Sequence, residues 1–148
     1  MSKVSVDAIR ILMVEDDEDD VLLTQRALKK ANIWNQVDVV RDGEEALDYL
    51  YNEGAFADKE AYPRPGLILL DLSLPGVDGR EVLERVADEP DLKDIPIVIV
   101  STSDYEKDIE FGRAQGVENY IIKPIGPDNI IEAIGRMTSF RVILGSVA

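Results

Sequence analysis

Side chains able to act together chemically stand at the ends of four apolar segments of this sequence. They are Glu15 and Asp16, Asp71, Ser101, and Lys123. Carboxylates crowded into one crevice repel one another, which raises a pKa or requires a cation. Hard carboxylate oxygens, in a chain without Cys or His, select Mg²⁺ or a similar ion. A carboxylate nucleophile, a divalent metal, an ammonium group and a hydroxyl are the parts needed to accept a phosphoryl group.

These residues can meet only if the segments before them form one sheet. Apolar segments of strand length cover residues 9–14, 37–40, 67–71, 95–100 and 119–122, and segments of helical period separate them. This alternation predicts an α/β fold with a doubly wound, five-stranded parallel sheet. The flavodoxin-like (βα)5 strand order 2-1-3-4-5 suits a chain of this length. Asp16 and Asp71 would then follow adjacent strands, about 4.8 Å apart, at the edge where such sheets bind ligands.

Helical periodicity also predicts which side chains of the helices face the core. In the first helix these are Val21, Leu22, Ala27, Leu28 and Ala31. In the last helix, which begins at about Pro127, they are Ile130, Ile131, Ile134 and Met137. The other helices are expected at about 44–51, at about 78–88 with Asp78 and Glu81 at its start, and from Ser103 with Glu106 to Gly116.

Length, charge and composition limit the class of protein. The 148 residues suit one domain, with a core at about 9–137, a long loop at 52–66 and a C-terminal extension at 138–148. Such a long loop is expected to be functional or mobile. The net charge of −14 repels phosphate backbones and anionic lipid, so neither a nucleic acid nor a membrane is expected as a partner. A chain with no Cys, no apolar run of about 18 residues and no signal peptide is expected to be cytoplasmic.

Some of these residues also have plainer interpretations. Acids at the start of a helix complement its dipole, so Asp17 to Asp20 are interpreted as a solvated face. Tyr120 is either a half-buried core residue or a switch, and the sequence leaves both open. Phe111 and Phe140 belong either to the core or to a protein-binding face on the last two helices.

A set of short motifs, in this order, resembles the receiver domains of two-component response regulators over about residues 9–137. The motifs are Val14-Glu15-Asp16-Asp17; Asp71 with Pro75, Asp78 and Gly79; Ser101-Thr102; and Tyr120-Ile121-Ile122-Lys123-Pro124. The resemblance implies that Asp71 accepts a phosphoryl group from the phosphohistidine of a histidine kinase, and that the protein is a phosphorylation-dependent switch.

The resemblance also implies the metal ligands. Glu15, Asp16, Asp71 and Ser73 would hold Mg²⁺, with Mn²⁺ or Ca²⁺ able to substitute. Asp16 would bind the ion directly, Glu15 through water, and Ser73 through its backbone carbonyl.

On the phosphoryl side, the resemblance implies that Lys123 pairs with the phosphoryl oxygens, with Ser101 and Thr102 beside it. Ser101 would swing toward the phosphate, and Tyr120 would turn inward in response. The Lys123–Pro124 peptide bond is cis in similar proteins.

Two features point to a subgroup of that family. The loop with Tyr62-Pro63-Arg64-Pro65, and Ser139-Phe140 near the end, resemble the Rcp-type regulators that partner phytochromes. A phytochrome-type histidine kinase is therefore the expected partner, with a homodimer formed through the last two helices, the fifth strand or the C-terminal extension. Glu15 and Ser101 stand where Asp and Thr are common, which keeps the chemistry but could change metal affinity and phosphate lifetime.

The sequence argues against three other functions. Phosphohydrolases of the haloacid dehalogenase type have an Asp-x-Asp motif, in which the second acid serves as general acid/base. This chain has Asp71-Leu72-Ser73 instead, so it lacks that acid. A flavodoxin-like cofactor binder needs a first loop that cradles phosphate, and the six acids from Glu15 to Asp20 would expel one. The intact acids and Lys123 argue against a scaffold that is never phosphorylated. The expectation is a signalling protein that catalyses only its own phosphorylation and dephosphorylation.

Overall fold

The computed structural model describes residues 9–72, 78–101, 106–117 and 119–135 of the chain. The strands are β1 (Ile11–Val14), β2 (Val37–Val40), β3 (Leu67–Asp71), β4 (Ile97–Ser101) and β5 (Asn119–Ile122). The helices are α1 (Glu18–Lys30), α2 (Gly43–Tyr51), the 3-10 turn η2 (Gly54–Phe56), α3 (Gly79–Asp88), α4 (Glu106–Ala114) and α5 (Pro127–Gly135).

The strands form one parallel sheet in the order β2-β1-β3-β4-β5, which confirms the predicted fold class and topology. Val14 is paired with Leu70 in the sheet, and Ser101 is paired with Ile122. The residues that follow these positions therefore emerge at the same edge of the sheet. This register is what brings the polar residues at the strand ends together.

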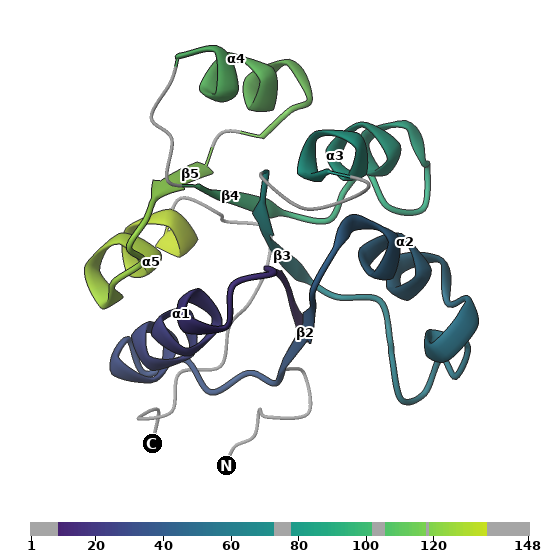
Figure 1. Cartoon of the computed structure of the whole chain (residues 1–148), viewed down its shortest axis with the longest axis horizontal. Helices are drawn as coiled ribbons and strands as arrows, with labels where there is room; N and C mark the ends of the chain where they lie inside the picture. The colour runs from purple at the N-terminus through teal and green to yellow at the C-terminus, as the bar shows by residue number, and fades with distance from the viewer. Residues whose placement is uncertain (1–8, 73–77, 102–105, 118, 136–148) are drawn as a thin grey trace.

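Alternate residues of the strands build an apolar core on each face of the sheet. Leu12 and Val14 belong to the core that includes residues of α2 and α3, whereas Ile11 and Met13 belong to the core that includes residues of α1 and α5. Figure 1 shows α1 and α5 on one side of the sheet and α2 and α3 on the other. Since both faces are covered, every residue of β3 is buried, and each large apolar side chain buried there contributes about 1.5–3 kcal/mol.

Two residues expected in the helix cores are instead exposed. Leu22 is 46% exposed and Ile131 is 51% exposed, although Val21 and Ile130 beside them are buried. Successive residues of an α-helix are turned by about 100°, so a neighbour of a core residue readily faces solvent. The predicted core positions Ile134 and Met137 lie outside the side chains that the structure describes.

The helix ends follow the chemistry of their sequences. The Asp78 carboxylate accepts hydrogen bonds from the backbone N–H groups of Arg80 at 2.9 Å and Glu81 at 3.1 Å, which confirms Asp78 as the cap of α3. Gly116, after α4, has a φ of 88°, a conformation that glycine adopts without strain. The cap expected at Ser103 lies outside the described residues.

The long loop after α2 is packed against the domain through three aromatic rings. The ring of Phe56 lies 5.3 Å from that of Tyr49 and 5.0 Å from that of Tyr62, measured between centroids. Asn52, in the left-handed conformation with a φ of 54°, donates side-chain hydrogen bonds to the carbonyls of Phe56 and Tyr62. The loop is therefore held in place by its own aromatic rings, which pack on one another and on Tyr49, and by the hydrogen bonds of Asn52.

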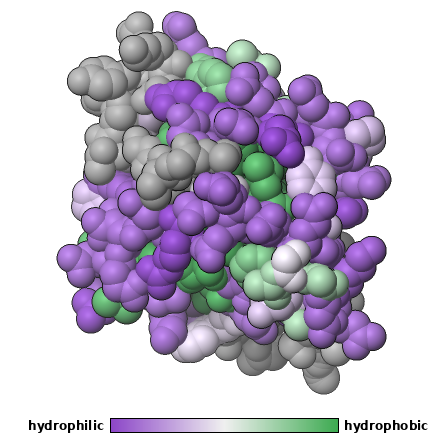
Figure 2. Space-filling model, turned by 45° about the vertical axis from the view of Figure 1, so that its right-hand side comes forward, coloured by the Kyte–Doolittle hydropathy of each residue, from purple (hydrophilic) through white to green (hydrophobic). Residues whose placement is uncertain are grey.

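The surface agrees with the strong negative charge. On the face shown in Figure 2, hydrophilic residues cover most of the area and apolar residues form smaller patches between them. Among the residues that the structure describes, no helix has the length and apolar character needed to cross a membrane.

Candidate functional site

The predicted site lies at the carboxyl ends of β1, β3, β4 and β5. Glu15 and Asp16 directly follow β1, Asp71 is the last residue of β3, Ser101 is the last residue of β4, and Lys123 directly follows β5. The parallel sheet thus brings together residues that are up to 108 positions apart in the chain (123 minus 15). Ser73 and Thr102, also expected here, lie outside the described residues.

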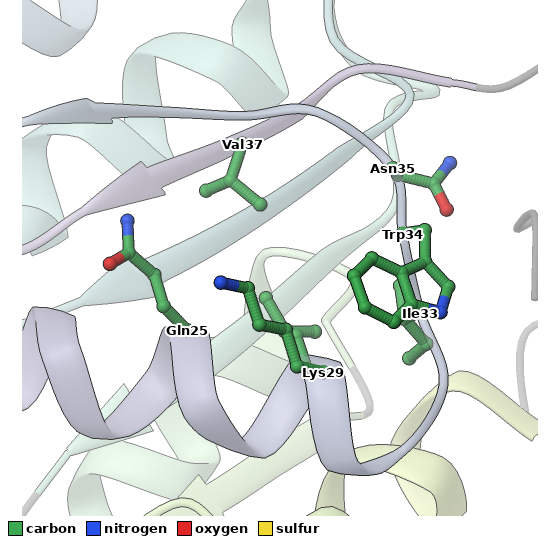
Figure 3. Close-up of a pocket in the computed structure, with 7 residues that line it drawn as sticks. Gln25, Lys29, Ile33, Trp34, Asn35 and Val37 are labelled. Atoms are coloured by element: carbon green, nitrogen blue, oxygen red, sulfur yellow. The ribbon is translucent and has the colours of Figure 1, made fainter. Parts of the chain in front are cut away.

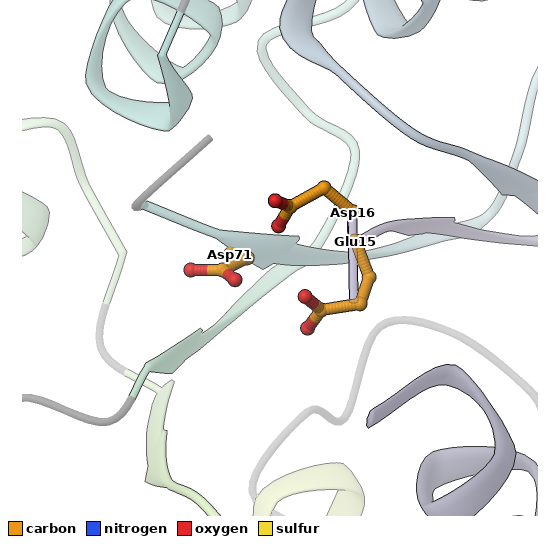
Figure 4. A group of neighbouring side chains, drawn as sticks. All are labelled: Glu15, Asp16 and Asp71. Atoms are coloured by element: carbon orange, nitrogen blue, oxygen red, sulfur yellow. The ribbon is translucent and has the colours of Figure 1, made fainter. Parts of the chain in front are cut away.

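Three carboxylates converge at the centre of this site. Glu15, Asp16 and Asp71 each present an oxygen, and these oxygens all lie within 4.8 Å of one another. Figure 4 shows the three side chains meeting from the ends of β1 and β3. Glu15 and Asp71 are buried, whereas Asp16 is exposed. Hard oxygen donors, two of them in a buried and negatively charged setting, fit a divalent cation such as Mg²⁺, which typically also keeps several waters.

Lys123 supplies the positive charge of the site. Its Nζ lies 2.7 Å from Glu15, 2.8 Å from Asp20 and 3.1 Å from Asp71, in each case measured to a carboxylate oxygen. An ammonium group has three N–H donors, so each can be directed to one carboxylate. Burial alone would lower the pKa of Lys123, but hydrogen bonds to Asp20, Glu15 and Asp71 outweigh it and raise that pKa above its usual value.

The surroundings of Glu15 make this carboxyl difficult to ionise. Burial and the negative charge of Asp71 raise the pKa of Glu15 to about 7, although the hydrogen bond from Lys123 acts in the opposite direction. A carboxyl that is difficult to ionise next to a second carboxylate is the arrangement that a bound cation relieves.

Ser101 and Tyr120 lie on neighbouring strands next to the cluster. Ser101 is buried, and its backbone carbonyl accepts a hydrogen bond of 2.8 Å from the backbone N–H of Lys123. Tyr120 is partly buried and packs against the core beneath α2 and α3. The peptide bond between Lys123 and Pro124 is cis, as the resemblance implied.

The start of α3 packs directly on the end of β3. A Cβ added to Gly79 would lie 2.2 Å from the backbone oxygen of Asp71 and 2.5 Å from Cα of Leu72. Atoms cannot approach this closely, so only glycine fits here. The position of the Asp71 backbone therefore depends on the absence of a side chain at Gly79.

Comparison with known proteins agrees with this geometry. The family model described as the response regulator receiver domain matches residues 11–135. The chain belongs to the response regulator receiver family. As a receiver, it is a signalling protein of the two-component type that works as a phosphorylation-dependent switch. The alternative function, a phosphohydrolase of the haloacid dehalogenase type, is not supported.

Its relatives include phytochrome response regulators. Response regulator Rcp1 of Synechocystis sp. is 39% identical over 130 residues, which is 88% of this chain and 86% of Rcp1. Among solved structures, the bacteriophytochrome response regulator RtBRR is 41% identical with a TM-score of 0.85, over 94% of this chain and 83% of that one. The phosphorylated cyanobacterial phytochrome response regulator RcpA is 39% identical with a TM-score of 0.77, over 91% and 98%. The receiver is therefore of the Rcp type.

The interpretation of Asp17 to Asp20 as a solvated face was wrong for one residue. Asp17 caps α1 by accepting hydrogen bonds from the backbone of Asp19 and Asp20, and Glu18 pairs with Arg41. The carboxylate of Asp20, however, turns into the site and contacts Lys123. The role of Asp20 could have been recognised from its position in the sequence. It is the third residue of a helix that begins beside the end of β1, and helical side chains tilt toward the N-terminus of the helix.

A separate hollow lies at the opposite end of α1 in this receiver. It has a volume of about 270 Å³ and is lined by Gln25, Leu28, Lys29, Ile33, Trp34, Asn35 and Val37. Figure 3 shows Gln25 and Lys29 on α1 facing Val37 of β2, with Trp34 and Asn35 on the connecting loop. Its lining contains no carboxylate, so it lacks the donors of the phosphoryl site.

Proposed function

We propose that Asp71 is the residue phosphorylated in this receiver. The observation that supports this is the cluster in which the Asp71 carboxylate lies beside Glu15 and Asp16 and 3.1 Å from Nζ of Lys123. An Asp71 oxygen attacks the phosphorus of the donor, the bond from phosphorus to the phosphohistidine nitrogen breaks, and that nitrogen keeps the electron pair. A phosphohistidine donor must belong to another protein, because this chain contains no histidine.

We further propose that Glu15, Asp16 and Asp71, with the backbone carbonyl of Ser73, hold Mg²⁺, for which Mn²⁺ or Ca²⁺ can substitute. The structure of Rcp1 in a Mn²⁺-bound form, 38% identical to this chain, supports the choice of a hard divalent ion. When bound, the ion neutralises charge on the phosphoryl oxygens. The ammonium group of Lys123, 3.1 Å from Asp71, would also neutralise charge and so stabilise the transferring group electrostatically.

Phosphorylation is proposed to act through Ser101 and Tyr120, with Thr102 beside Lys123 at the phosphoryl group. The added group carries up to about two negative charges, and the buried hydroxyl of Ser101 at the end of β4 can move toward it. Tyr120 pairs with Ile99 on the neighbouring strand β4 and is only partly buried, so more of its side chain would become buried if it turned inward. These movements would shift the β4–α4 and β5–α5 units between two states.

A phytochrome-type histidine kinase is the proposed upstream partner, and a change in self-association is the proposed output. Relatives that include RtBRR and RcpA carry phytochrome names. Exposed apolar side chains at Ile122 on β5 and Ile131 on α5 support a homodimer through this side of the molecule, with residues 138–148 as a further candidate contact.

Intact-protein mass spectrometry after incubation with acetyl phosphate and Mg²⁺ tests the modification site. The wild-type protein should gain one phosphoryl group, and Asp71→Asn should gain none. Asp91→Asn, at an exposed acid distant in sequence from the site, should be modified like the wild type. Labelling that persists in Asp71→Asn would reject the assignment.

A transfer assay tests the partner. A phosphorylated phytochrome-type histidine kinase should pass its phosphoryl group to this receiver with a kcat/KM at least about tenfold above that of a histidine kinase from another sensor class. Equal values for the two kinases would reject the phytochrome pairing while leaving the site assignment intact.

A further inference from the structure

Asp20 is an ion-pair partner of Lys123 that the metal site does not include. Its Oδ2 atom lies 2.8 Å from Nζ of Lys123, and the two residues are 103 positions apart in the chain. The other two partners of the ammonium, Glu15 and Asp71, belong to the group of acids that can hold a cation. Asp20 is therefore able to keep its contact with Lys123 when the other two carboxylates are engaged elsewhere.

The Asp20 carboxylate comes from a rigid support. Asp20 lies in the first turn of α1, where its backbone N–H donates a hydrogen bond of 3.2 Å to the capping carboxylate of Asp17. The next residue, Val21, is buried in the core shared with α5. The Asp20 side chain is 27% exposed, and that of Lys123 is 10% exposed, so the pair is only partly screened by solvent.

Lys123 needs a fixed partner because its own side chain is flexible. An ammonium group on a flexible four-carbon stem loses much rotamer freedom when it is held in one place. In the proposed reaction, the N–H groups directed at Glu15 and Asp71 turn to the phosphoryl oxygens. A lysine that then had no fixed partner would have to be ordered by the reacting group itself.

We propose that Asp20 is a positioning residue that holds Nζ of Lys123 at the phosphoryl site through metal binding and phosphoryl transfer. This proposal rests on the proposed function of Asp71 and Lys123. Asp20 acts through Lys123 only: it takes no proton, binds no metal and does not touch the donor. Its removal should slow phosphorylation without weakening Mg²⁺ binding.

The first test is the rate constant of Asp71 phosphorylation by acetyl phosphate at saturating Mg²⁺. Asp20→Ala should lower it about tenfold, and Asp20→Asn about threefold, because the amide oxygen still accepts a hydrogen bond. Asp19→Ala is the matched control: it removes the same charge from the adjacent, exposed residue and should stay within about twofold of the wild type. An Asp20→Ala rate equal to that of Asp19→Ala would overturn the proposal.

A double-mutant cycle separates positioning from a general effect on the pocket. In a Lys123→Ala background, Asp20→Ala should change the residual rate by less than about twofold, because the residue through which it acts is gone. The same tenfold loss in that background would overturn the proposal. If circular dichroism shows that Asp20→Ala is misfolded, the rate of Asp20→Asn compared with that of Asp19→Ala decides the proposal instead.

A readout that requires no phosphorylation completes the test. The side-chain ammonium resonance of Lys123, observed by ¹H–¹⁵N NMR with Mg²⁺ present, should be protected from solvent exchange in the wild type and in Asp19→Ala but lost in Asp20→Ala. Persistence of the resonance in Asp20→Ala would contradict the anchoring role. If the wild type accepts no phosphoryl group, the proposed function fails, and this resonance still decides the anchoring role on its own.

Discussion

Nζ of Lys123 lies 3.1 Å from the carboxylate of Asp71, so the cation supplied by the chain shares a pocket with the acids that fit a metal ion. The same Nζ lies 2.7 Å from Glu15. Lys123 therefore stabilises the crowded acids by charge, but it also competes with Mg²⁺ for their oxygens. Lys123 should therefore weaken Mg²⁺ binding but accelerate phosphoryl transfer.

Lys123→Ala should bind Mg²⁺ roughly tenfold more tightly than the wild type, because unit charges this close interact by more than 1 kcal/mol even at high effective dielectric. The same variant should accept the phosphoryl group more slowly and lose the structural response. Isothermal titration with MgCl₂ measures the first effect, and amide chemical shifts of α4 and α5 measure the response. Lys93→Ala, at an exposed lysine, should leave both unchanged. Weaker Mg²⁺ binding in Lys123→Ala would contradict the competition.

Gly79→Ala should destabilise the fold by about 3 kcal/mol, because the new methyl group would overlap the backbone of Asp71 and Leu72. Moving that backbone also displaces the Asp71 carboxylate, so Mg²⁺ affinity should fall with stability. Urea unfolding measures the first effect and calorimetric titration the second.

Gly126→Ala is the matched control for this substitution. Gly79 is the first residue of α3 and Gly126 directly precedes α5, but a Cβ on Gly126 would meet no atom within 4 Å. The control should therefore stay within about 0.5 kcal/mol of the wild type. Equal stability of the two variants would show that the α3–β3 contact is looser than described.

The sheet and its site could both be predicted because both follow from the parallel arrangement of buried strands. Buried parallel strands are read as continuous apolar runs, and their shared direction requires the residues after them to meet at one edge. Asp16 and Asp71 could therefore be placed side by side from the sequence, and the structure brings them there. Asp78 could be recognised as a cap because its side-chain chemistry is local.

The errors concern positions that local patterns do not determine. Asp20 has the same side chain as Asp19, and only its direction relative to Lys123, 103 positions away, distinguishes the two. Leu22 and Ile131 are apolar, and their exposure depends on how each helix is rotated against the sheet. The contacts of the loop after α2 depend on rings that meet only after folding.

Phe56→Ala should destabilise the protein by about 2 kcal/mol, because it removes the ring that contacts both Tyr49 and Tyr62. Amide hydrogen exchange should accelerate within residues 52–66 more than in β3. Trp34→Ala, which removes a ring that is 56% exposed, should cost clearly less. A uniform increase in exchange over the whole domain, with no preference for the loop, would argue against a locally packed loop.

Asp38 on β2 should make the stability of the domain depend on pH. Burial by itself would raise the pKa of Asp38, but hydrogen bonds from Tyr49, Arg10 and Gln36 outweigh it and hold that pKa below its usual value. The folded state therefore binds the Asp38 proton less tightly than the unfolded state does. The resulting stabilisation is present above the unfolded pKa of about 3.9 and is lost as the pH falls through the lower folded value.

Asp38→Asn should accordingly reduce the free energy of unfolding by about 1–3 kcal/mol at about pH 6, because the charge-assisted bond of 2.7 Å from Nη1 of Arg10 is lost. The difference from the wild type should shrink toward about pH 3, because below about 3.9 the unfolded state of the wild type gains a proton that the folded state binds less tightly. Urea unfolding at the two pH values measures it, with Asp94→Asn as the exposed control. If the gap between Asp38→Asn and the wild type stays constant down to the acid limit, the ion pair does not account for the stability, because a contribution from an ionised carboxylate must disappear when that carboxylate is protonated.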